Sequence, residues 1–147
     1  MKQTRIIGLD VGEARIGVAI SDPTLKIAQP LLVIERRSVD ADAGRICRLA
    51  AERGAHTAVV GLPLTLKGER GTQAQAVEAF ARKLEESGLE VVMWDERMTT
   101  RMAERSLLEA DMSRRDRKRL TDKVAAVLIL QSYLDYLNEG STDETPV

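Results

Sequence analysis

Carboxylates at three separated places in the chain have the types and positions to bind a metal ion. Asp10 ends one apolar run, the adjacent Asp95 and Glu96 end another, and Asp122 opens a helix-prone stretch. Acids at the carboxyl ends of parallel strands converge on one edge of a sheet, where their like charges repel unless protons or cations compensate them. Because carboxylate oxygens suit hard cations, these acids predict a site for Mg²⁺ or Mn²⁺.

Each of these acids also has a structural interpretation, which the spacing leaves open. Asp10 can initiate the turn at Gly12, although a carboxylate directly after a buried apolar run is poorly placed for that role alone. Asp95 and Glu96 can be a solvated strand end. Asp122 can be an acid that the positive end of a helix dipole favours. A metal site therefore requires that the acids meet in space.

The chain contains little else that could do catalytic chemistry. Cys47 is the only cysteine and His56 the only histidine, which excludes an internal disulfide, a thiolate zinc site and a histidine-rich zinc site. We expect Cys47, at helical spacing from Ala43 and Ala50, to lie in the core. We expect His56 to have a structural or surface role. Catalysis would then depend on acids, a metal and water, in a reducing compartment.

Length and composition indicate a single domain. The chain has 147 residues, of which 44% are hydrophobic and 31% are charged, with a formal net charge of -1. Aromatic residues make up 3%, which argues against a platform on which single-stranded bases stack. No apolar run reaches the ~18 residues of a membrane span, and no signal-peptide pattern is present, so we expect a cytoplasmic protein. The domain should cover residues 1–137, followed by a polar tail at 138–147.

A basic stretch lies between the last two acidic positions. Residues 97–119 hold eight arginines and lysines against four acids, which leaves a local charge of +4. Such a stretch can be a solvated arm, but its place between Glu96 and Asp122 favours contacts with substrate phosphates, which give affinity without sequence information. The candidate nucleic-acid-binding residues are Arg97, Arg101, Arg114, Arg115 and Lys123, together with Lys67 in an earlier loop.

The apolar pattern predicts five strands. Residues 6–11 and 15–21 flank a turn signal and should form a hairpin, and residues 27–34 should form a third strand whose Pro30 favours an edge position. Residues 57–62 and 89–94 alternate with helices, which is typical of parallel strands. We therefore expect an α/β fold with a mixed five-stranded sheet. Its first three strands should be antiparallel and the rest parallel, with helices on both faces.

Three helices are expected between and after these strands. The first should begin after the N-cap Ser38 and stop at Gly54. The second should run to about residue 87 from Thr72, which forms a capping-box pattern with Gln75. The last should be capped by Thr121 and cover residues 122–137.

The last helix should carry Asp122 towards the strand ends. Positions three and four residues further on are Ala125 and Ala126, and Ile129 and Tyr133 continue the same face. Two alanines would let this helix approach the sheet closely.

Four motifs follow one another along the chain. They are Ile-Gly-Leu-Asp-Val-Gly at 7–12 followed by Ile-Gly-Val-Ala at 16–19, Val-Gly-Leu-Pro-Leu at 60–64 followed by glycine at 68, Trp-Asp-Glu-Arg-Met-Thr-Thr at 94–100, and Asp-Lys-Val-Ala-Ala-Val-Leu-Ile-Leu at 122–130. Each motif alone is weak, but together they resemble the YqgF (RuvX) family, RuvC-like members of the ribonuclease H superfamily, over residues 5–137. The structural positions of these motifs are Gly12, Gly17, Gly61, Pro63 and Gly68.

This resemblance implies a ribonuclease H-like fold and a metal-dependent nuclease. Family members are described as pre-16S ribosomal RNA nucleases or as Holliday-junction resolvase homologues, so precursor rRNA or branched DNA is the expected substrate and a ribosome precursor a candidate partner. The family's acidic positions correspond to Asp10, to Asp95 or Glu96, and to Asp122, and we prefer Glu96 to Asp95 as a ligand. The expected last helix, residues 122–137, has no second acid near Asp122, since Asp135 is three to four turns away, which argues against activity on four-way junctions.

A two-metal hydrolysis follows as a hypothesis. Asp10 would bridge two ions about 4 Å apart, and Glu96 and Asp122 would each complete one site, so that one ion activates water and the other stabilises the leaving 3′ oxygen. Two other classes stay open. Residues 10–12 followed by 16–19 are also similar to the first phosphate loop of the actin/sugar-kinase superfamily, but 147 residues leave no room for its two lobes. A non-catalytic nucleic-acid-binding factor is the third, and acids at all three places argue against it.

Overall fold

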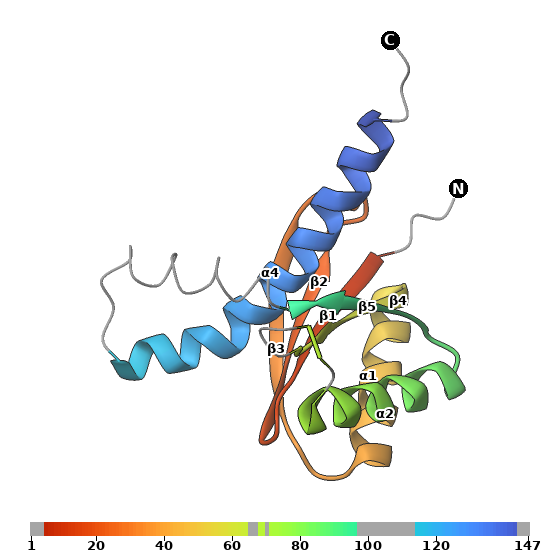
Figure 1. Cartoon of the computed structure of the whole chain (residues 1–147). Helices are drawn as coiled ribbons and strands as arrows, with labels where there is room; N and C mark the ends of the chain where they lie inside the picture. The colour runs from red at the N-terminus through yellow and green to blue at the C-terminus, as the bar shows by residue number, and fades with distance from the viewer. Residues whose placement is uncertain (1–4, 65–67, 70, 97–113, 144–147) are drawn as a thin grey trace.

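The computed structural model describes residues 5–64, 68–69, 71–96 and 114–143, and in the last of these ranges it describes the side chains of 124–139. The elements shown in Figure 1 are β1 (Arg5–Val11), β2 (Arg15–Ser21), β3 (Ala28–Glu35), α1 (Val39–Arg53), β4 (Ala55–Leu62), α2 (Thr72–Glu86), β5 (Glu90–Asp95) and α4 (Arg114–Asp143). All five predicted strands are present, with bounds that differ by at most two residues. Among the described residues, no helix has the length and apolar character needed to cross a membrane.

The strands form one mixed sheet in the order β3-β2-β1-β4-β5. β2 pairs antiparallel with β1 and β3, whereas β4 pairs parallel with β1 and β5, which confirms the expected topology. Pro30 lies on the edge strand β3, where the register shifts between Val18 and Ala19 of β2. An edge strand tolerates the missing N–H of proline, as expected. Because β1, β4 and β5 are parallel, their carboxyl ends lie along the same edge of the sheet.

Helices cover both faces of the sheet, also as expected (Figure 1). α1 and α2 pack on one face, over a core that includes Leu9, Val11 and Phe80. α4 crosses the other face and contributes Ala126 and Ile129 to a second, smaller core. Both of these α4 side chains are fully buried, so this helix lies directly on the strands.

α1 begins and ends where the sequence predicts. The side chain of Ser38 accepts a hydrogen bond from the N–H of Ala41 at 3.1 Å, which satisfies one free donor of the first turn. Gly54 ends the helix with φ 74°, a left-handed conformation that glycine adopts without a steric penalty. Local signals therefore suffice to define both ends of this helix.

The start of α2 differs from the prediction. Gly71 is the N-cap, Thr72 is the first helical residue, and no side chain caps the helix. The N–H of Gln75 instead donates to the carbonyl of Gly71 at 3.1 Å. The predicted capping box is therefore wrong, because the helix begins one residue earlier with a backbone bond that needs no side chain.

The predicted bounds of the last helix are also wrong. α4 begins at Arg114 rather than after Thr121, so Thr121 does not cap it and Asp122 lies in its interior rather than in its first turn. Apart from Asp116, residues 114–120 are arginines, a lysine and a leucine, which are good helix formers and extend the helix ahead of the capping signal. The helix also continues to Asp143, so it includes residues 138–143 of the expected polar tail.

Candidate active site

Asp10 lies near the carboxyl end of β1, on the sheet face that α4 covers. Its neighbours Leu9 and Val11 are buried in the core under α1 and α2, and successive strand residues point to opposite faces. In the hairpin, Asp10 stands opposite the buried Gly17 of β2. The half-buried Asp10 therefore has no side chain beside it on β2 and is directed to the α4 side.

Glu96 follows β5 directly and lies beside Gly61 of β4. A Cβ atom on Gly61 would be 3.2 Å from Oε2 of Glu96 and 2.6 Å from Cδ1 of Ile129 on α4. Carbon atoms approach one another no closer than about 3.5 Å without repulsion. Any side chain at position 61 would therefore displace Glu96, Ile129 or both.

Asp10 and Glu96 meet although their strands are not neighbours. β4 lies between β1 and β5, so the two backbones are roughly 9–10 Å apart. The carboxyl groups nevertheless form a hydrogen bond with each other. The long side chain of Glu96 reaches over β4 at the position where Gly61 has no side chain. Gly61 is thus part of the geometry that brings the two acids together.

Asp95 does not take part in this contact. It alternates along β5 with Trp94, which packs in the core on the α4 side, so Asp95 belongs to the opposite face of the sheet. The sequence left open which of the two acids accompanies Asp10. The described geometry places Glu96 beside Asp10, and Glu96 is the acid that we preferred as a ligand.

The contact has a clear electrostatic consequence. The pKa of Glu96 is raised from 4.5 to about 7. The largest cause is the burial of Glu96, and the smaller causes are the charge of Asp10 and the hydrogen bond between the two side chains. At neutral pH the pair therefore lies between its singly and doubly ionised states. A titratable group near neutrality in a partly buried acidic pair is typical of a functional site.

The same chemistry fits a divalent cation. Two carboxylates that repel each other in a partly buried site are relieved when a hard cation binds between them. Asp10 and Glu96 are the two ligands that the described side chains supply. Those side chains hold no cluster of three or more acidic, histidine or cysteine groups that could bind a metal, and the side chain of Asp122 lies outside them. A third ligand would have to come from α4 or from a segment beyond the described residues.

Close packing of α4 positions the backbone of Asp122. A Cβ atom on Gly8 of β1 would be 2.6 Å from Cβ of Leu130 and 3.1 Å from the carbonyl oxygen of Ala126. The expected close approach of this helix is therefore present, with Ala126 and Ile129 buried and Gly8 as a contributor that the residue spacing did not indicate. Asp122 lies one helical turn before Ala126.

Arg36 supports the turn that follows Asp10, a role that the sequence did not indicate. Its Nη1 donates to the carbonyl of Gly12 at 2.8 Å, and its Nε donates to the buried carboxylate of Asp42 at 2.8 Å. The same guanidinium lies over the ring of Phe80, 5.3 Å from its centroid. Arg36 thus joins the β1–β2 turn to both α1 and α2. In the sequence Asp42 has only the signature of a first-turn helix acid.

The other predicted site residues divide into three groups. Gly12 occupies the hairpin turn, where its N–H donates to the carbonyl of Arg15 at 2.8 Å. Pro63 follows β4, and Gly68 has a φ of 81° in the loop after it. Asp122, Arg114, Arg115 and Lys123 lie in α4, where only their backbone is described. Lys67, Arg97 and Arg101 lie outside the described residues.

The single histidine and cysteine lie where the sequence predicts. His56 is exposed near the start of β4. Cys47 is partly buried and packs against the core under α1. Neither belongs to the acidic pair of Asp10 and Glu96.

The few aromatic residues are concentrated rather than scattered. Trp94 of β5 contacts Tyr133 and Tyr136 of α4, with ring centroids 5.3 Å and 5.4 Å away. The indole N–H of Trp94 donates to the side chain of Ser132 at 3.1 Å. This cluster fixes β5 against α4 just before Glu96. Composition alone could not reveal it.

Comparison with known proteins identifies the family. The chain matches the RuvX family, described as "Holliday junction resolvase", over residues 4–136. A protein of Moorella thermoacetica is 52% identical over 137 residues, which cover 92% of this chain and 98% of that protein. A protein of Symbiobacterium thermophilum is 50% identical over 132 residues, which cover 89% of this chain and 92% of that protein. Both carry the name "Putative pre-16S rRNA nuclease".

Solved structures agree on the fold. RuvC of T. thermophilus, in complex with a Holliday junction substrate, superposes with a TM-score of 0.61 at 17% identity, over 94% of this chain and 97% of that one. The large terminase nuclease of the thermophilic phage G20c superposes with a TM-score of 0.56 at 12% identity, over 88% and 81%. These likenesses confirm the RuvC-like, ribonuclease H-type fold that the motifs imply. From the match over nearly its whole length, the chain belongs to the RuvX family of RuvC-like nucleases.

Proposed function

We propose that this chain is a divalent-metal-dependent nuclease that processes the precursor of 16S ribosomal RNA in the cytoplasm. The observation that carries the proposal is the contact between Asp10 and Glu96, in which two carboxyl groups from separate strands share a hydrogen bond in a partly buried site. Such a pair is costly for stability and suited to binding a cation. The names of the relatives support the choice of RNA substrate.

In this proposal three acids hold Mg²⁺ or Mn²⁺. Asp10 would be shared, with Glu96 and Asp122 each completing one ion site. Bound ions would supply Lewis-acid activation of water and stabilisation of the leaving 3′ oxygen. Asp122 is included because its helix packs closely on the sheet and it lies one turn before the buried Ala126.

The chain's own residues prepare this site. Glu96 loses its proton when it becomes a ligand, which its pKa of about 7 allows near neutral pH. Gly61 leaves room for the Glu96 side chain, and the buried Ile129 of α4 lies against the same glycine. Arg36 holds the turn after Asp10 through the carbonyl of Gly12.

We further propose that basic residues around the site bind substrate phosphates. Residues 97–119 have a local charge of +4 and lie in sequence between Glu96 and Asp122. Contacts of this kind make affinity fall steeply with salt and give little base discrimination. The proposed phosphate contacts are Arg97, Arg101, Arg114, Arg115, Lys123 and Lys67.

A branched-DNA substrate is the second candidate. The description of the RuvX family as Holliday junction resolvase supports it. We place it second because α4 has no acid near Asp122 other than the basic stretch's own Asp116, and Asp135 is more than three turns away. The close relatives are named for rRNA rather than for junctions.

Cleavage assays with three acid variants test the proposal. The purified chain should cut a pre-16S rRNA fragment when Mg²⁺ or Mn²⁺ is present and should not cut it in EDTA. We expect Asp10→Asn and Glu96→Gln to lower the cleavage rate at least ~100-fold, while substrate binding is retained. Asp95→Asn is the matched control, because Asp95 lies beside Glu96 but on the other face, and it should retain most of the activity.

Each of two results would contradict a different part of the proposal. Equal cleavage by the wild type and Asp10→Asn would overturn the metal site. Cleavage of a four-way DNA junction, with the rRNA fragment left intact, would replace the RNA substrate with branched DNA and leave the metal site in place.

A further inference from the structure

The aromatic cluster between β5 and α4 reaches the surface of the molecule. Trp94, Tyr133 and Tyr136 are three of the four aromatic residues in the chain, and their ring centroids are 5.3, 5.4 and 6.3 Å apart. Trp94 and Tyr133 are partly buried against the core under α4, whereas Tyr136 is 58% exposed. The outer side of the cluster is therefore open to a partner.

The exposed ring lies away from the acidic pair. Ile129 of α4 lies against Gly61, beside Glu96. Tyr136 follows Ile129 by seven residues, so it is about 10 Å further along the axis of the helix. A role for its exposed ring is therefore separate from the proposed metal chemistry.

The charge of α4 changes sign along the helix. Residues 114–123 contain six arginines and lysines and two acids. Residues 124–143, which carry the two tyrosines, contain three acids and no arginine or lysine. The first part of the helix thus suits a negatively charged ligand, and the second part suits a positively charged one.

Two exposed acids adjoin the rings. Glu139 follows Tyr136 by three residues on α4, so the two side chains are neighbours on one face of the helix. Burial is the largest cause that raises the pKa of the Tyr133 phenol, and the charge of Glu90 on β5 is the second, so Glu90 is close to this ring. We call the three rings, with Glu90 and Glu139, the aromatic-acidic surface.

Rings and carboxylates at one place favour the same ligand group, a guanidinium. The faces of tyrosine and tryptophan rings attract cations, and the planar guanidinium of arginine also stacks on them. A neighbouring carboxylate accepts hydrogen bonds from the same group. A nucleic-acid strand fits poorly, because its phosphates would meet Glu90 and Glu139 beside a part of α4 that has no arginine or lysine.

A single arginine would bind too weakly to remain in place. Cation–π contacts and ion pairs at exposed sites are each weak, because water and salt screen them. A segment with several arginines can contact the Tyr136 ring, Glu90 and Glu139 at the same time, and these contacts then reinforce one another. The surface therefore fits an arginine-rich segment of a protein better than a small cation.

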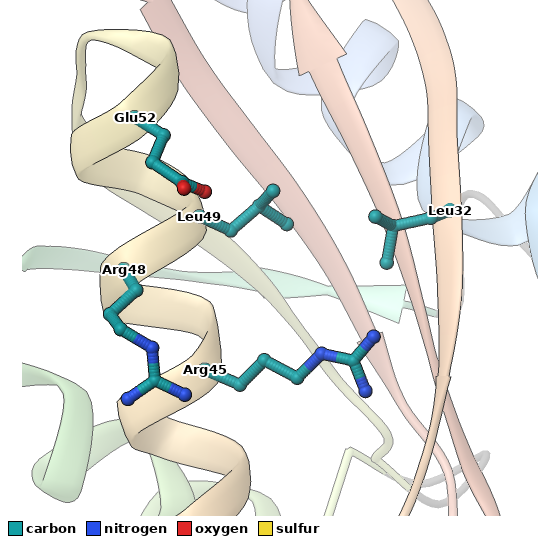
Figure 2. A pocket seen from close by; sticks show the side chains of 5 residues that line it. All are labelled: Leu32, Arg45, Arg48, Leu49 and Glu52. Atoms are coloured by element: carbon teal, nitrogen blue, oxygen red, sulfur yellow. The ribbon is translucent and has the colours of Figure 1, made fainter.

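The cleft between α1 and β3, on the other face of the sheet, does not suit such a segment. Its volume is about 320 Å³, and its lining residues are Leu32, Arg45, Arg48, Leu49 and Glu52. Figure 2 shows the Arg45 side chain extended from α1 towards β3, so an arginine-rich segment would meet like charge there. Glu52 of this cleft is an exposed acid outside the aromatic-acidic surface and can serve as a control.

We propose that the aromatic-acidic surface binds an arginine-rich segment of a partner protein. One guanidinium of the segment stacks on the exposed ring of Tyr136, and neighbouring arginines pair with Glu90 and Glu139. This binding uses neither Asp10 nor Glu96 as a ligand, so it does not depend on the proposed nuclease function.

Titration of the full, metal-free chain with a short peptide of alternating arginine and glycine tests the proposal. Calorimetry measures the affinity, and fluorescence locates the binding, because Trp94 is the only tryptophan in the chain. We expect a Kd below about 1 mM at low salt, with a change in Trp94 emission that saturates in parallel. The same peptide with glutamate in place of arginine should bind at least ~10-fold more weakly. No saturation at about 5 mM arginine peptide would overturn the proposal.

Variants assign the binding to the named residues. Tyr136→Ala and the double variant Glu90→Gln/Glu139→Gln should each weaken the arginine peptide at least ~3-fold. The matched control Glu52→Gln/Glu85→Gln removes the same charge from exposed positions on α1 and α2 and should leave the affinity unchanged. Equal weakening by the two double variants would overturn the proposal, since it would show a general charge effect. Circular dichroism melting of each variant verifies that it is folded.

Two further titrations test other places and other occupants. Asp10→Asn should bind the arginine peptide as the wild type does, and loss of binding in this variant would place the peptide on the acidic pair and overturn the proposal. Single-stranded RNA should bind Tyr136→Ala and the wild type equally. RNA binding that is lost in Tyr136→Ala, without binding of the arginine peptide to the wild type, would make this surface a nucleic-acid site and overturn the proposal.

Discussion

Asp10 and Glu96 share a hydrogen bond across β4, and Gly61 is the residue over which they meet. Adjacent strands are ~4.8 Å apart, so acids on β1 and β5 cannot touch unless one side chain is long and the strand between them presents no side chain. The chain meets both conditions, with a glutamate after β5 and a glycine at position 61. The acidic site is therefore a property of three strands rather than of two acids.

Gly61→Ala should separate the two acids. The new Cβ would be 2.6 Å from Cδ1 of Ile129 and 3.2 Å from Oε2 of Glu96, so the side chain of one or both must move. We expect a loss of about 1–3 kcal/mol in stability from overpacking and at least a ~10-fold lower cleavage rate. Denaturant unfolding and a cleavage assay measure the two effects.

Gly44→Ala is the matched control for this substitution. A Cβ on Gly44 of α1 meets only the end of the Arg48 side chain, at 3.7 Å, and alanine favours a helix more than glycine does. Its stability should be unchanged or higher by up to ~1 kcal/mol, with normal cleavage. Normal cleavage by Gly61→Ala as well would contradict the role given to Gly61.

The metal-free protein should lose stability as the pH rises from about 4.5 to about 7. Burial is the largest cause that raises the pKa of Glu96, and Asp10 is the second, so folding favours the protonated form of Glu96. The corresponding stabilisation is complete below the unfolded-state pKa of 4.5 and is lost as the pH passes through the folded-state pKa of about 7. Thermal unfolding in EDTA at pH 5 and pH 8 measures the change.

Glu96→Gln isolates this contribution from those of other groups. The variant cannot ionise at position 96, so it should match the wild type at pH 5 and melt higher than the metal-free wild type at pH 8. With Mn²⁺ present the order should reverse at pH 8, because ionised Glu96 is then a ligand. If the wild type melted higher than Glu96→Gln in EDTA at pH 8, ionised Glu96 would not destabilise the metal-free protein.

Caps and turn residues in the sequence predict those helix ends that depend on contacts within one turn. Ser38 and Gly54 define α1 because a cap and a left-handed glycine act within one turn. The start of α4 was missed because the helix propensity of residues 114–120 outweighs the capping signal of Thr121, a balance that no single motif shows. Thr72 was misassigned for a related reason, since a backbone bond from Gln75 to Gly71 replaces the expected side-chain cap.

The candidate site is predictable from the sequence only in part. Parallel strands bring their carboxyl ends together, so the meeting of Asp10 with an acid after β5 follows from topology. Strand alternation then separates Asp95 from Glu96, but only once the register of β5 is known. Arg36 could not be found in this way, because its contacts with Gly12, Asp42 and Phe80 join elements that pattern and spacing do not place side by side.

Removal of Arg36 should destabilise the protein more than removal of an exposed cation. Asp42 is 2% exposed, and Arg36→Leu would leave its carboxylate buried without the guanidinium partner, which costs about 3–5 kcal/mol. Asp42→Asn in the same chain should recover part of that loss, because no buried charge then remains. Denaturant unfolding of the two single variants and the double variant measures the coupling.

Lys83→Ala is the control for this measurement. Lys83 forms ion pairs with Asp40 and Glu86 on the surface, where solvent screens them, and its loss should leave the unfolding midpoint nearly unchanged. If Arg36→Leu were as mild as Lys83→Ala, the Arg36 contacts would not support the turn after Asp10.

Gly8→Ala should displace α4 from the sheet and thereby test whether this helix belongs to the active site. The new Cβ would be 2.6 Å from Cβ of Leu130 and 3.1 Å from the carbonyl oxygen of Ala126, and neither atom can move without the helix backbone. We expect a loss of at least ~2 kcal/mol in stability and, at temperatures where the variant remains folded, weaker binding of Mn²⁺. Because Leu130→Ala keeps the Cβ atom, it should not relieve Gly8→Ala, whereas Leu130→Gly should relieve part of the clash. Full Mn²⁺ affinity in a folded Gly8→Ala variant would place the third ligand outside α4 and remove Asp122 from the proposed site.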